Sequence, residues 1–395
     1  MKKIILYNPH IDDFLGEPPH FRLLRRRPLK KYGFLIDAII KEQGQLLVVI
    51  DGTLSCFISP HYFKLIPKYI RLLISLLEYY IWVKINKLQK VKLISSNNND
   101  FKSHILIAFS YKAATGNFKL RRAFLNKFSA VYFHLSHYFV STSEKSDNLK
   151  TISNVWLAGD SDLSDNDYYN AYFHWYKNDF ITLPFAVKSR FVNRTPFSSR
   201  ESRCVATGSV HTLSKERPVQ AYYDYKTQTG LDTYHPLRKE IYENSENISK
   251  NIECLVTPYR TYIPTSLFND WVSHFFVSQK KYLSMDIVEI YNKYKFAVVG
   301  EEASGFPALG MFEAMACGCV VFADPRRLAG LDLVAGTHYI QYDGSLKGLL
   351  SSLSLANNNQ DISSISLVGE QIVQLLFSEN NVGLSWINKI QSYSK

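Results

Sequence analysis

The 395-residue sequence has few cysteines, no long uninterrupted hydrophobic run and no internal repeat, which argues against disulfide-rich, membrane-spanning and solenoid proteins. The five cysteines are scattered, and Cys317 and Cys319 lack the spacing of a zinc knuckle. We therefore expect reduced, half-buried cysteines. Residues 1–13 contain lysines but only a short apolar run, so we expect no signal peptide and a cytoplasmic protein.

Acidic residues are fewer than basic ones. The sequence contains 35 Asp and Glu and 46 Lys and Arg, which gives a formal charge of +11. Such an excess predicts an anionic partner: a nucleotide diphosphate, an anionic lipid or a nucleic acid. Nucleic acid is disfavoured, because no binding motif is present and the cations are not interleaved with aromatic residues. The 46% hydrophobic content and the length allow two globular domains.

Short apolar runs that end in turn residues predict strands of buried parallel sheets. We expect them at residues 3–7, 45–50, 104–110, 130–133, 204–208, 296–299 and 320–322. Helical stretches separate these runs, so the fold class is α/β with doubly wound, Rossmann-like domains. Their ligand crevices would lie at the carboxyl ends of the strands.

The segment Leu183–Arg203 loses hydrophobic periodicity and gains Arg, Ser and Pro, which predicts a linker. We therefore expect an N-terminal domain at 1–190 and a C-terminal domain at 204–364. The remaining residues, 365–395, would carry one long helix from Ile365 to Ile390.

The most informative segment, Lys295 to Asp324, has the pattern of a strand, a glycine-containing loop, a helix and a second strand. Ser304, Gly305 and Pro307 predict the start of the helix, and Gly318 predicts its end. The N–H groups at such a helix start suit an anion. Glu313 is the one charged residue of the helix, and its apolar flanks argue against a solvated face. It therefore needs a polar partner.

The sequence FEAMACGCVV in this segment resembles the C-terminal signature of GT-B glycosyltransferases, especially the retaining glycosyltransferase family 4, also called glycosyl transferases group 1. A weaker match extends the resemblance to about residue 350. It implies two Rossmann-like domains facing a cleft, with acceptor binding in the first and nucleotide-sugar binding in the second. It also implies that the final helix crosses back onto the N-terminal domain.

In the family, the glutamate matching Glu313 binds the ribose hydroxyls of the donor nucleotide. The helix start that faces the diphosphate corresponds here to Gly305, Phe306, Pro307, Ala308, Leu309 and Gly310. A second family glutamate, which contacts the transferred sugar, precedes the first by eight residues, and Gly305 occupies that position. Glu301 or Glu302 is the candidate replacement, which leaves the donor sugar and the choice between retention and inversion open.

A departing nucleotide diphosphate accumulates negative charge, so the site needs a cation. The family places an Arg and a Lys five residues apart after the first strand of the second domain, where this chain has Ser209 and Ser214. We expect Lys215, Arg217 or Arg238 to bind the diphosphate instead.

Candidate catalytic residues lie in the N-terminal domain. His134 and His137 follow a predicted strand, and the resemblance implies contact of His137 with the donor sugar or acceptor, whereas a core role is the alternative. If the enzyme inverts, Asp160 or Asp162 would deprotonate the acceptor. Otherwise these aspartates cap a helix that begins near Asp165. No metal or cofactor is expected beyond the nucleotide diphosphate sugar as co-substrate.

Two segments of the predicted N-terminal domain could contact a membrane. The cluster Arg22, Arg25, Arg26, Arg27, Lys30 and Lys31 is either a solvated face or a contact with an anionic membrane surface. Residues 62–90 are apolar but contain several cations, which disfavours a transmembrane span. A helix in the membrane interface and a buried core helix both remain open.

Together these features predict a metal-independent, hexosyltransferase-type glycosyltransferase. It would transfer a sugar from a nucleotide diphosphate donor to a glycan or lipid-linked acceptor, in bacterial-type surface polysaccharide assembly at the inner face of the membrane. The alternative is a catalytically degenerate GT-B protein that binds a glycan or a partner enzyme. The missing glutamate at Gly305 favours the alternative, and Glu313 opposes it.

Overall fold

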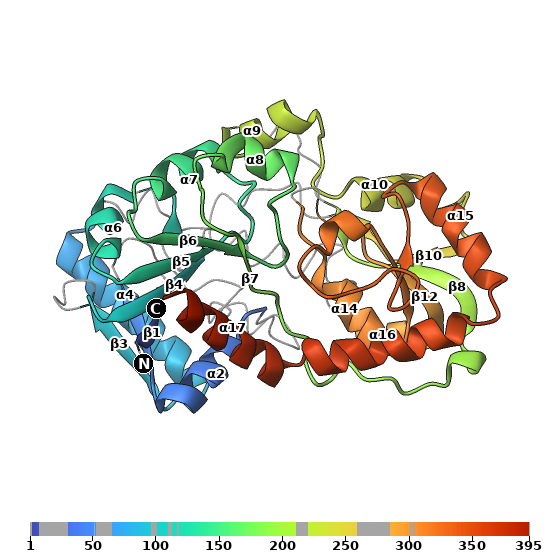
Figure 1. The fold of residues 1–395 in the computed structure, drawn as a ribbon, viewed down its shortest axis with the longest axis horizontal. Coiled ribbons are helices and arrows are strands. Elements are labelled where there is room, and N and C mark those ends of the chain that lie inside the picture. Colours follow the sequence, from blue (N-terminus) through green and yellow to red (C-terminus); the bar gives the residue numbers. More distant parts are fainter. Residues whose placement is uncertain are drawn as a thin grey trace. The chain divides into compact units, whose positions relative to one another are not determined.

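The computed structural model describes residues 2–7, 31–50, 52, 65–95, 101–109, 113–116, 118–210, 220–258, 285–300, 302 and 305–394. The chain divides into two compact units (Figure 1). Unit 1 comprises Met1–Gly159, Asn170–Leu183 and Val382–Lys395, and unit 2 comprises Asp160–Tyr169 and Pro184–Asn381. The predicted domain limits of 1–190, 204–364 and 365–395 stay a prediction.

Unit 1 contains a seven-stranded parallel sheet in the order β3-β2-β1-β4-β5-β6-β7. The strands are β1 (Lys3–Tyr7), β2 (Leu46–Ile50), β3 (Val91–Ser95), β4 (His104–Phe109), β5 (Ala130–His134), β6 (Val155–Gly159) and β7 (Ile181–Thr182). The central strands are buried almost throughout, because apolar runs without alternation suit a parallel sheet that is covered on both faces. The four strands predicted for this part of the chain are confirmed within the described residues.

Helices connect the strands of this sheet (Figure 1). They are α2 (Phe34–Gln43), α4 (Lys68–Ile85), α6 (Phe118–Leu125), α7 (Thr142–Leu149) and α8 (Asp167–Phe173). The last helix of the chain, α17 (Glu379–Tyr393), packs onto the same unit.

Trp386 of α17 is fully buried in an aromatic cluster. Its ring stacks on His134 with centroids 5.2 Å apart, and it also contacts Tyr32 and Phe34. The hydroxyl of Tyr132 donates a hydrogen bond of 2.8 Å to the carbonyl of Ile390. The last residues of the chain therefore complete the core that its first strands begin.

Unit 2 contains a five-stranded parallel sheet in the order β10-β8-β12-β13-β14 and a two-stranded sheet, β11-β9. The strands are β8 (Glu201–Ala206), β9 (Ser209–Val210), β10 (Ile252–Cys254), β11 (Thr257–Pro258), β12 (Tyr294–Val298), β13 (Val320–Ala323) and β14 (Ile340–Gln341). The helices are α9 (Gln220–Thr229), α10 (Pro236–Glu243), α13 (Ile287–Lys293), α14 (Leu309–Ala316), α15 (Leu346–Asn357) and α16 (Ile362–Leu376), with short 3-10 turns η1 (Phe197–Ser199) and η2 (Pro325–Arg327).

The prediction of one helix from Ile365 to Ile390 is wrong, because α16 and α17 are separate helices that meet at Phe377 and Ser378. The N–H of Val187 donates a hydrogen bond of 2.7 Å to the carbonyl of Phe377, and Val187 also pairs with Ser378 in an isolated bridge. This contact with a distant segment fixes the break. No proline or glycine stands at 377–378 to announce it.

Burial of Trp386 predicts a large loss of stability when the ring is removed. Trp386→Ala should lower the free energy of unfolding of unit 1 by about 3–5 kcal/mol, because it leaves a cavity beside His134. Denaturant unfolding followed by near-ultraviolet circular dichroism measures this change. Asn388→Ala, at an exposed position of the same helix, is the control and should change little; equal effects of the two variants would contradict the packing role.

Candidate functional site

The sheet of unit 2 has a topological switch point between β8 and β12. From there β10 lies on one side, and β13 and β14 lie on the other. Open parallel sheets bind ligands at the carboxyl ends of the strands beside such a point. Gly208 follows β8 with a φ of +120°, and Gly300 follows β12 with a φ of +65°. The carboxyl ends of these two strands define the candidate site.

Arg238 of α10 ties these two strand ends together. Its side chain is buried, and its Nη1 and Nη2 donate hydrogen bonds to the carbonyls of Ser209 (3.1 Å) and Gly300 (2.8 Å). Its Nε donates to the carbonyl of Val299. A Cβ atom at Gly208 would lie 2.9 Å from this Nε, so only glycine fits there. Arg238 therefore has a structural role, and its binding of a diphosphate stays a prediction.

The other two predicted diphosphate ligands, Lys215 and Arg217, lie outside the described residues. So do Glu301 and Ser304, while Glu302 is described.

The predicted helix start is too early. Helix α14 begins at Leu309, with Ala308 in an extended conformation as its N-cap, rather than at Ser304 to Pro307. Gly305 has a φ of +105°, which is incompatible with a right-handed helix. Residues 306–308 are therefore a loop that leads into the helix. The predicted end of the helix is confirmed, since Gly318 follows the C-cap with a φ of +79°.

Gly305, at the position where the family has a glutamate, is tightly enclosed. A Cβ atom there would lie 2.6 Å from the Nδ2 of Asn166 and 2.9 Å from a methyl group of Leu163. Both contacts come from residues 160–169, which belong to unit 2. A side chain at this position requires the side chains of Asn166 and Leu163 to shift.

Glu313 lies half-buried in the second turn of α14. Burial raises the pKa of its carboxyl from the ordinary 4.5 to about 7, and the positive charges of Arg190 and then Lys188 oppose that shift. These two cations are therefore the positive charges that act on Glu313, and the sequence pattern did not single them out. The guanidinium of Arg190 also lies over the ring of Phe191, 4.6 Å from its centroid. Glu313 can accept or release a proton near neutral pH.

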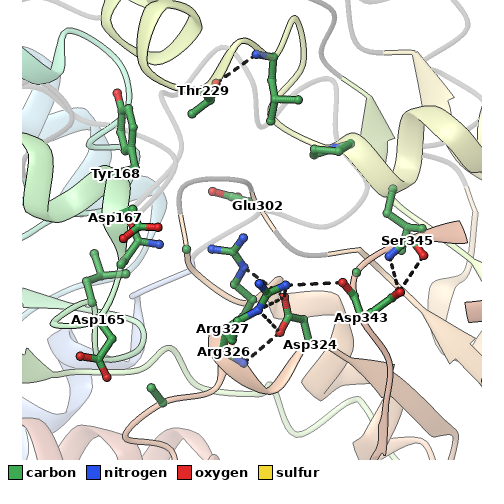
Figure 2. Close-up of a pocket in the computed structure, with 18 of the residues that line it drawn as sticks. Asp165, Asp167, Tyr168, Thr229, Glu302, Asp324, Arg326, Arg327, Asp343 and Ser345 are labelled. Atoms are coloured by element: carbon green, nitrogen blue, oxygen red, sulfur yellow. Dashed lines mark hydrogen bonds and ion pairs between the residues drawn. The ribbon is translucent and has the colours of Figure 1, made fainter. Parts of the chain in front are cut away.

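A cavity of about 800 Å³ opens where β12, β13 and β14 end (Figure 2). Its polar lining includes Asp162, Asp165, Asn166, Asp167, Tyr168, Gln228, Thr229, Glu240, Glu302, Asp324, Arg326, Arg327, Asp343 and Ser345. Asp165 and Asp167 lie across from Asp324, Arg326 and Arg327 in Figure 2. All lining residues belong to unit 2.

Two aspartates stabilise the side of the cavity that is formed by the residues after β13 and β14. Asp324 accepts hydrogen bonds from the backbone and the guanidinium of Arg326, with Nη2 2.7 Å from Oδ2. Asp343 accepts from the N–H and the hydroxyl of Ser345, and these bonds hold the pKa of Asp343 below its ordinary value. These hydrogen bonds hold both carboxylates in fixed positions at the edge of the cavity.

The cavity combines acceptors and donors in the way that a ligand with several hydroxyl groups requires. Carboxylates accept hydrogen bonds from hydroxyls, and guanidinium groups donate to hydroxyl or phosphate oxygens. Among the predicted site residues, Asp162 and Gly305 line the cavity, and Glu302 does so as well.

Asp324, Arg326, Arg327 and Asp343 also line the cavity, although no motif identified in the sequence pointed to them. A signal was present, because the sequence Asp-Pro-Arg-Arg follows the last residue of β13 directly.

The predicted catalytic residues lie in different environments. His137, in unit 1, is half-buried with a φ of +50°, and its carbonyl accepts a 2.7 Å hydrogen bond from the Nζ of Lys145. Lys145 is fully buried, which lowers the pKa of its amine to about 7. Asp160 is buried, whereas Asp162 accepts hydrogen bonds from the backbone and hydroxyl of Ser164. Their catalytic roles stay predictions.

The structure bears on two structural roles predicted from the sequence, that of a core histidine and that of a helix cap. His134 is a core residue, since its Nε2 lies 3.0 Å from the carbonyl of Leu183 and its ring stacks on Trp386. Helix α8 starts two residues after Asp165, and Asn166 caps it by accepting from the N–H of Tyr169.

Metal ligands do not gather in the described part of the chain. It contains no group of three or more His, Cys, Asp or Glu side chains arranged to bind a metal ion.

The sequence matches no protein-family model and no curated protein. Solved structures do match. A glycosyltransferase from Rickettsia africae has a TM-score of 0.51 at 10% identity, covering 99% of this chain and 98% of that one. Sucrose-phosphate synthase from Thermosynechococcus elongatus has a TM-score of 0.50 at 11% identity, covering 100% of this chain and 99% of that one. At such identities the likeness shows the fold alone, and it confirms the predicted two-domain α/β fold of the GT-B type.

The raised pKa of Glu313 predicts a pH-dependent stability. A carboxyl whose pKa is higher in the folded state holds its proton more strongly there, so stability falls as pH rises from about 4.5 to about 7. The full shift corresponds to about 3 kcal/mol. Glu313→Gln carries no titrating proton and should lack this loss.

The measurement is denaturant unfolding of the native protein and the variant across that pH range. Glu289→Gln, at an exposed position of α13, is the matched control and should follow the native protein. A Glu313→Gln curve parallel to the native one would show that Glu313 titrates normally.

The enclosure of Gly305 predicts that even a methyl group there is costly. Gly305→Ala should lower the stability of unit 2 by about 1–3 kcal/mol, because it adds contacts with Asn166 and Leu163 to a strained backbone. Gly336→Ala is the control, since Gly336 also has a positive φ but nothing lies within 4 Å of its Cβ position. If thermal unfolding shows the two variants equally destabilised, the segment 163–166 does not enclose Gly305.

Proposed function

We propose that this protein is a glycosyltransferase that uses a nucleotide diphosphate sugar as donor. The observation that carries the proposal is Glu313, a half-buried carboxyl in the second turn of α14, which follows a glycine-containing loop beside the switch point of a GT-B-type fold. A carboxylate accepts hydrogen bonds from two vicinal ribose hydroxyls, and no other group on α14 can do so.

The donor would bind to unit 2. Glu313 would hold the ribose, and the loop and first turn from Gly305 to Gly310 would face the diphosphate with their N–H groups. Lys215, Arg217 or Arg238 would supply the cation. As the acceptor hydroxyl attacks the anomeric carbon, the electrons of the breaking bond pass to the diphosphate oxygen, and a cation stabilises that charge.

The sugar of the donor would occupy the polar cavity. Its carboxylates and the guanidinium groups of Arg326 and Arg327 match the several hydroxyl groups of a hexose. This supports a hexosyltransferase. Glu302 is the glutamate that lines the cavity beside Gly305, so it is our candidate for the missing family contact.

The finer features of the function are also proposals. They include a metal-independent reaction, with His137 and either Asp160 or Asp162 in catalytic roles, and a glycan or lipid-linked acceptor of surface polysaccharide assembly. They further include a cytoplasmic location at the inner face of the membrane. The basic cluster proposed to contact that membrane lies outside the described residues from Arg22 to Lys30, while Lys31 places its ammonium 5.2 Å from the ring centroid of Tyr32.

The alternative, a degenerate GT-B protein that binds a glycan without transfer, is favoured by one observation. Gly305 is enclosed by the side chains of Leu163 and Asn166, so the usual sugar-contacting side chain would fit there only if these two side chains shifted. Transfer then depends on whether Glu302 or another cavity residue takes over this contact.

A donor panel tests the proposal. Thermal-shift measurements with nucleotide diphosphate sugars should identify at least one that stabilises the protein, and slow hydrolysis of that donor should be detectable. Glu313→Ala should weaken donor binding about tenfold or more, because it removes charge-assisted hydrogen bonds. Glu289→Ala is the control for the loss of an exposed carboxylate.

Three outcomes decide between the functions. If no donor stabilises the protein or is hydrolysed, the glycosyltransferase proposal is wrong. Donor binding without hydrolysis or transfer would favour the degenerate binder. Unchanged donor affinity in Glu313→Ala would refute the ribose contact.

A further inference from the structure

Helix α4 of unit 1 has an apolar stripe that faces solvent. Leu65, just before the helix, and Tyr69, Leu73, Leu77 and Tyr80 are 75%, 68%, 61%, 59% and 55% exposed. Their spacings of four, four, four and three residues place them along one side of a helix. The stripe therefore runs along most of the length of α4.

The opposite side of α4 is the one that packs on the sheet. Its buried residues are Ser75, Glu78, Tyr79 and Trp82, and the helix contacts β2 and β3. Burial in unit 1 thus explains one face of the helix and leaves the apolar stripe unexplained. Contiguous exposed apolar surface of this kind marks an interaction site.

The charges of residues 65–92 are positive with one exception. Residues 65–92 contain six cations, Lys68, Arg71, Lys84, Lys87, Lys90 and Lys92, and one acid, Glu78, which gives a net charge of +5. Glu78 is buried on the sheet side, whereas Lys68, Lys84, Lys87 and Lys90 are exposed. The stripe is therefore bordered by positive charge.

We propose that α4 docks unit 1 onto the surface of an anionic phospholipid bilayer. The leucines and tyrosines of the stripe would enter the boundary between headgroups and acyl chains, and the lysines would contact lipid phosphates. The helix would lie along the membrane, since one face is held by the sheet. No helix of the described residues is long and apolar enough to cross a bilayer.

A second copy of the chain is the competing occupant, and charge argues against it. In an antiparallel two-fold contact between stripes, Lys68 of one copy would approach Lys84 of the other. Like charges at such a contact are unfavourable, whereas anionic headgroups neutralise both. The tyrosines at positions 69 and 80 also suit an interface in which the ring is apolar and the hydroxyl is wet.

This inference concerns the surface of unit 1 and does not require that the proposed sugar transfer occurs. If it does, docking would hold the enzyme where a lipid-linked acceptor is found. For residues 65–90, the described part of the stretch 62–90, the structure thereby favours the interfacial interpretation over the buried core helix.

Flotation of the full chain with phosphatidylcholine vesicles, with and without phosphatidylglycerol, tests the proposal. The native protein should float with the anionic vesicles and much less with the neutral ones. Leu73→Ser/Leu77→Ser should lower the partition coefficient more than tenfold, because the apolar side chains drive insertion. Each of Lys68→Glu and Lys84→Glu should lower it about fivefold or more.

The matched control is Leu367→Ser/Leu375→Ser, two exposed leucines of α16 in unit 2. It should float like the native protein. Because all four leucines are exposed, both double variants should fold, which circular dichroism checks. Equal loss in the control, or no flotation of the native protein, would overturn the proposal.

A concentration-dependent dimer that Leu73→Ser/Leu77→Ser abolishes, together with no vesicle binding, would assign the stripe to a second copy instead. Equal binding to neutral and anionic vesicles would refute the headgroup contact. Flotation is measured without donor, and the donor thermal shift is measured without lipid. Failure of lipid docking and failure of the glycosyltransferase proposal are therefore separate results.

Discussion

The burial of Trp386 between His134, Tyr32 and Phe34 is the interaction on which unit 1 depends. Residues near the two ends of the chain meet there, because strand β5 forms the floor of the cluster and α17 supplies its cover. Burial raises the pKa of Tyr132 to about 12, so its hydroxyl stays protonated and donates to the carbonyl of Ile390. The Nζ of Lys389 donates to the carbonyl of Thr182 in the same way. Unit 1 therefore cannot complete its core until the chain has passed through unit 2 and returned.

In unit 2, two buried arginines link separate segments of the backbone by hydrogen bonds. Arg200, in the segment before β8, donates to the carbonyls of Thr195, Tyr291 and Cys317, and Arg238 donates to three carbonyls at the ends of β8 and β12. Carbonyl dipoles compensate the desolvation of each guanidinium. A basic composition alone therefore overstates the charge available to an anionic ligand, because some of the cations hold the backbone.

The segment around Glu313 follows the GT-B sequence signature in its strand and helix but departs from it in the loop between them. The strand, helix and glycine stop follow the family pattern, and Glu313 sits in the second turn of α14 beside the charges of Arg190 and Lys188. The loop before α14 departs from it, because Gly305 has a positive φ and is enclosed by Leu163 and Asn166. In its place, side chains from the ends of β13 and β14 build a polar cavity next to the loop. In the proposed function, the contacts with the donor sugar would then come from residues that the signature does not include.

The sequence by itself determined the α/β class, most strands of the two sheets, and the strand and helix around Glu313, because apolar runs and glycine stops act over a few neighbouring residues. Three features needed the tertiary structure. The break between α16 and α17 depends on Val187, about 190 residues away. The cavity joins Asp162 to Arg326 and Asp343, which no spacing in the sequence relates. For the helix α4 the sequence left an interfacial and a core position open, and only packing decided that Tyr79 and Trp82 are buried while Leu73 and Leu77 face solvent. Local patterns fix which elements form, whereas the choice of what each side chain touches is made by contacts between residues far apart in the chain.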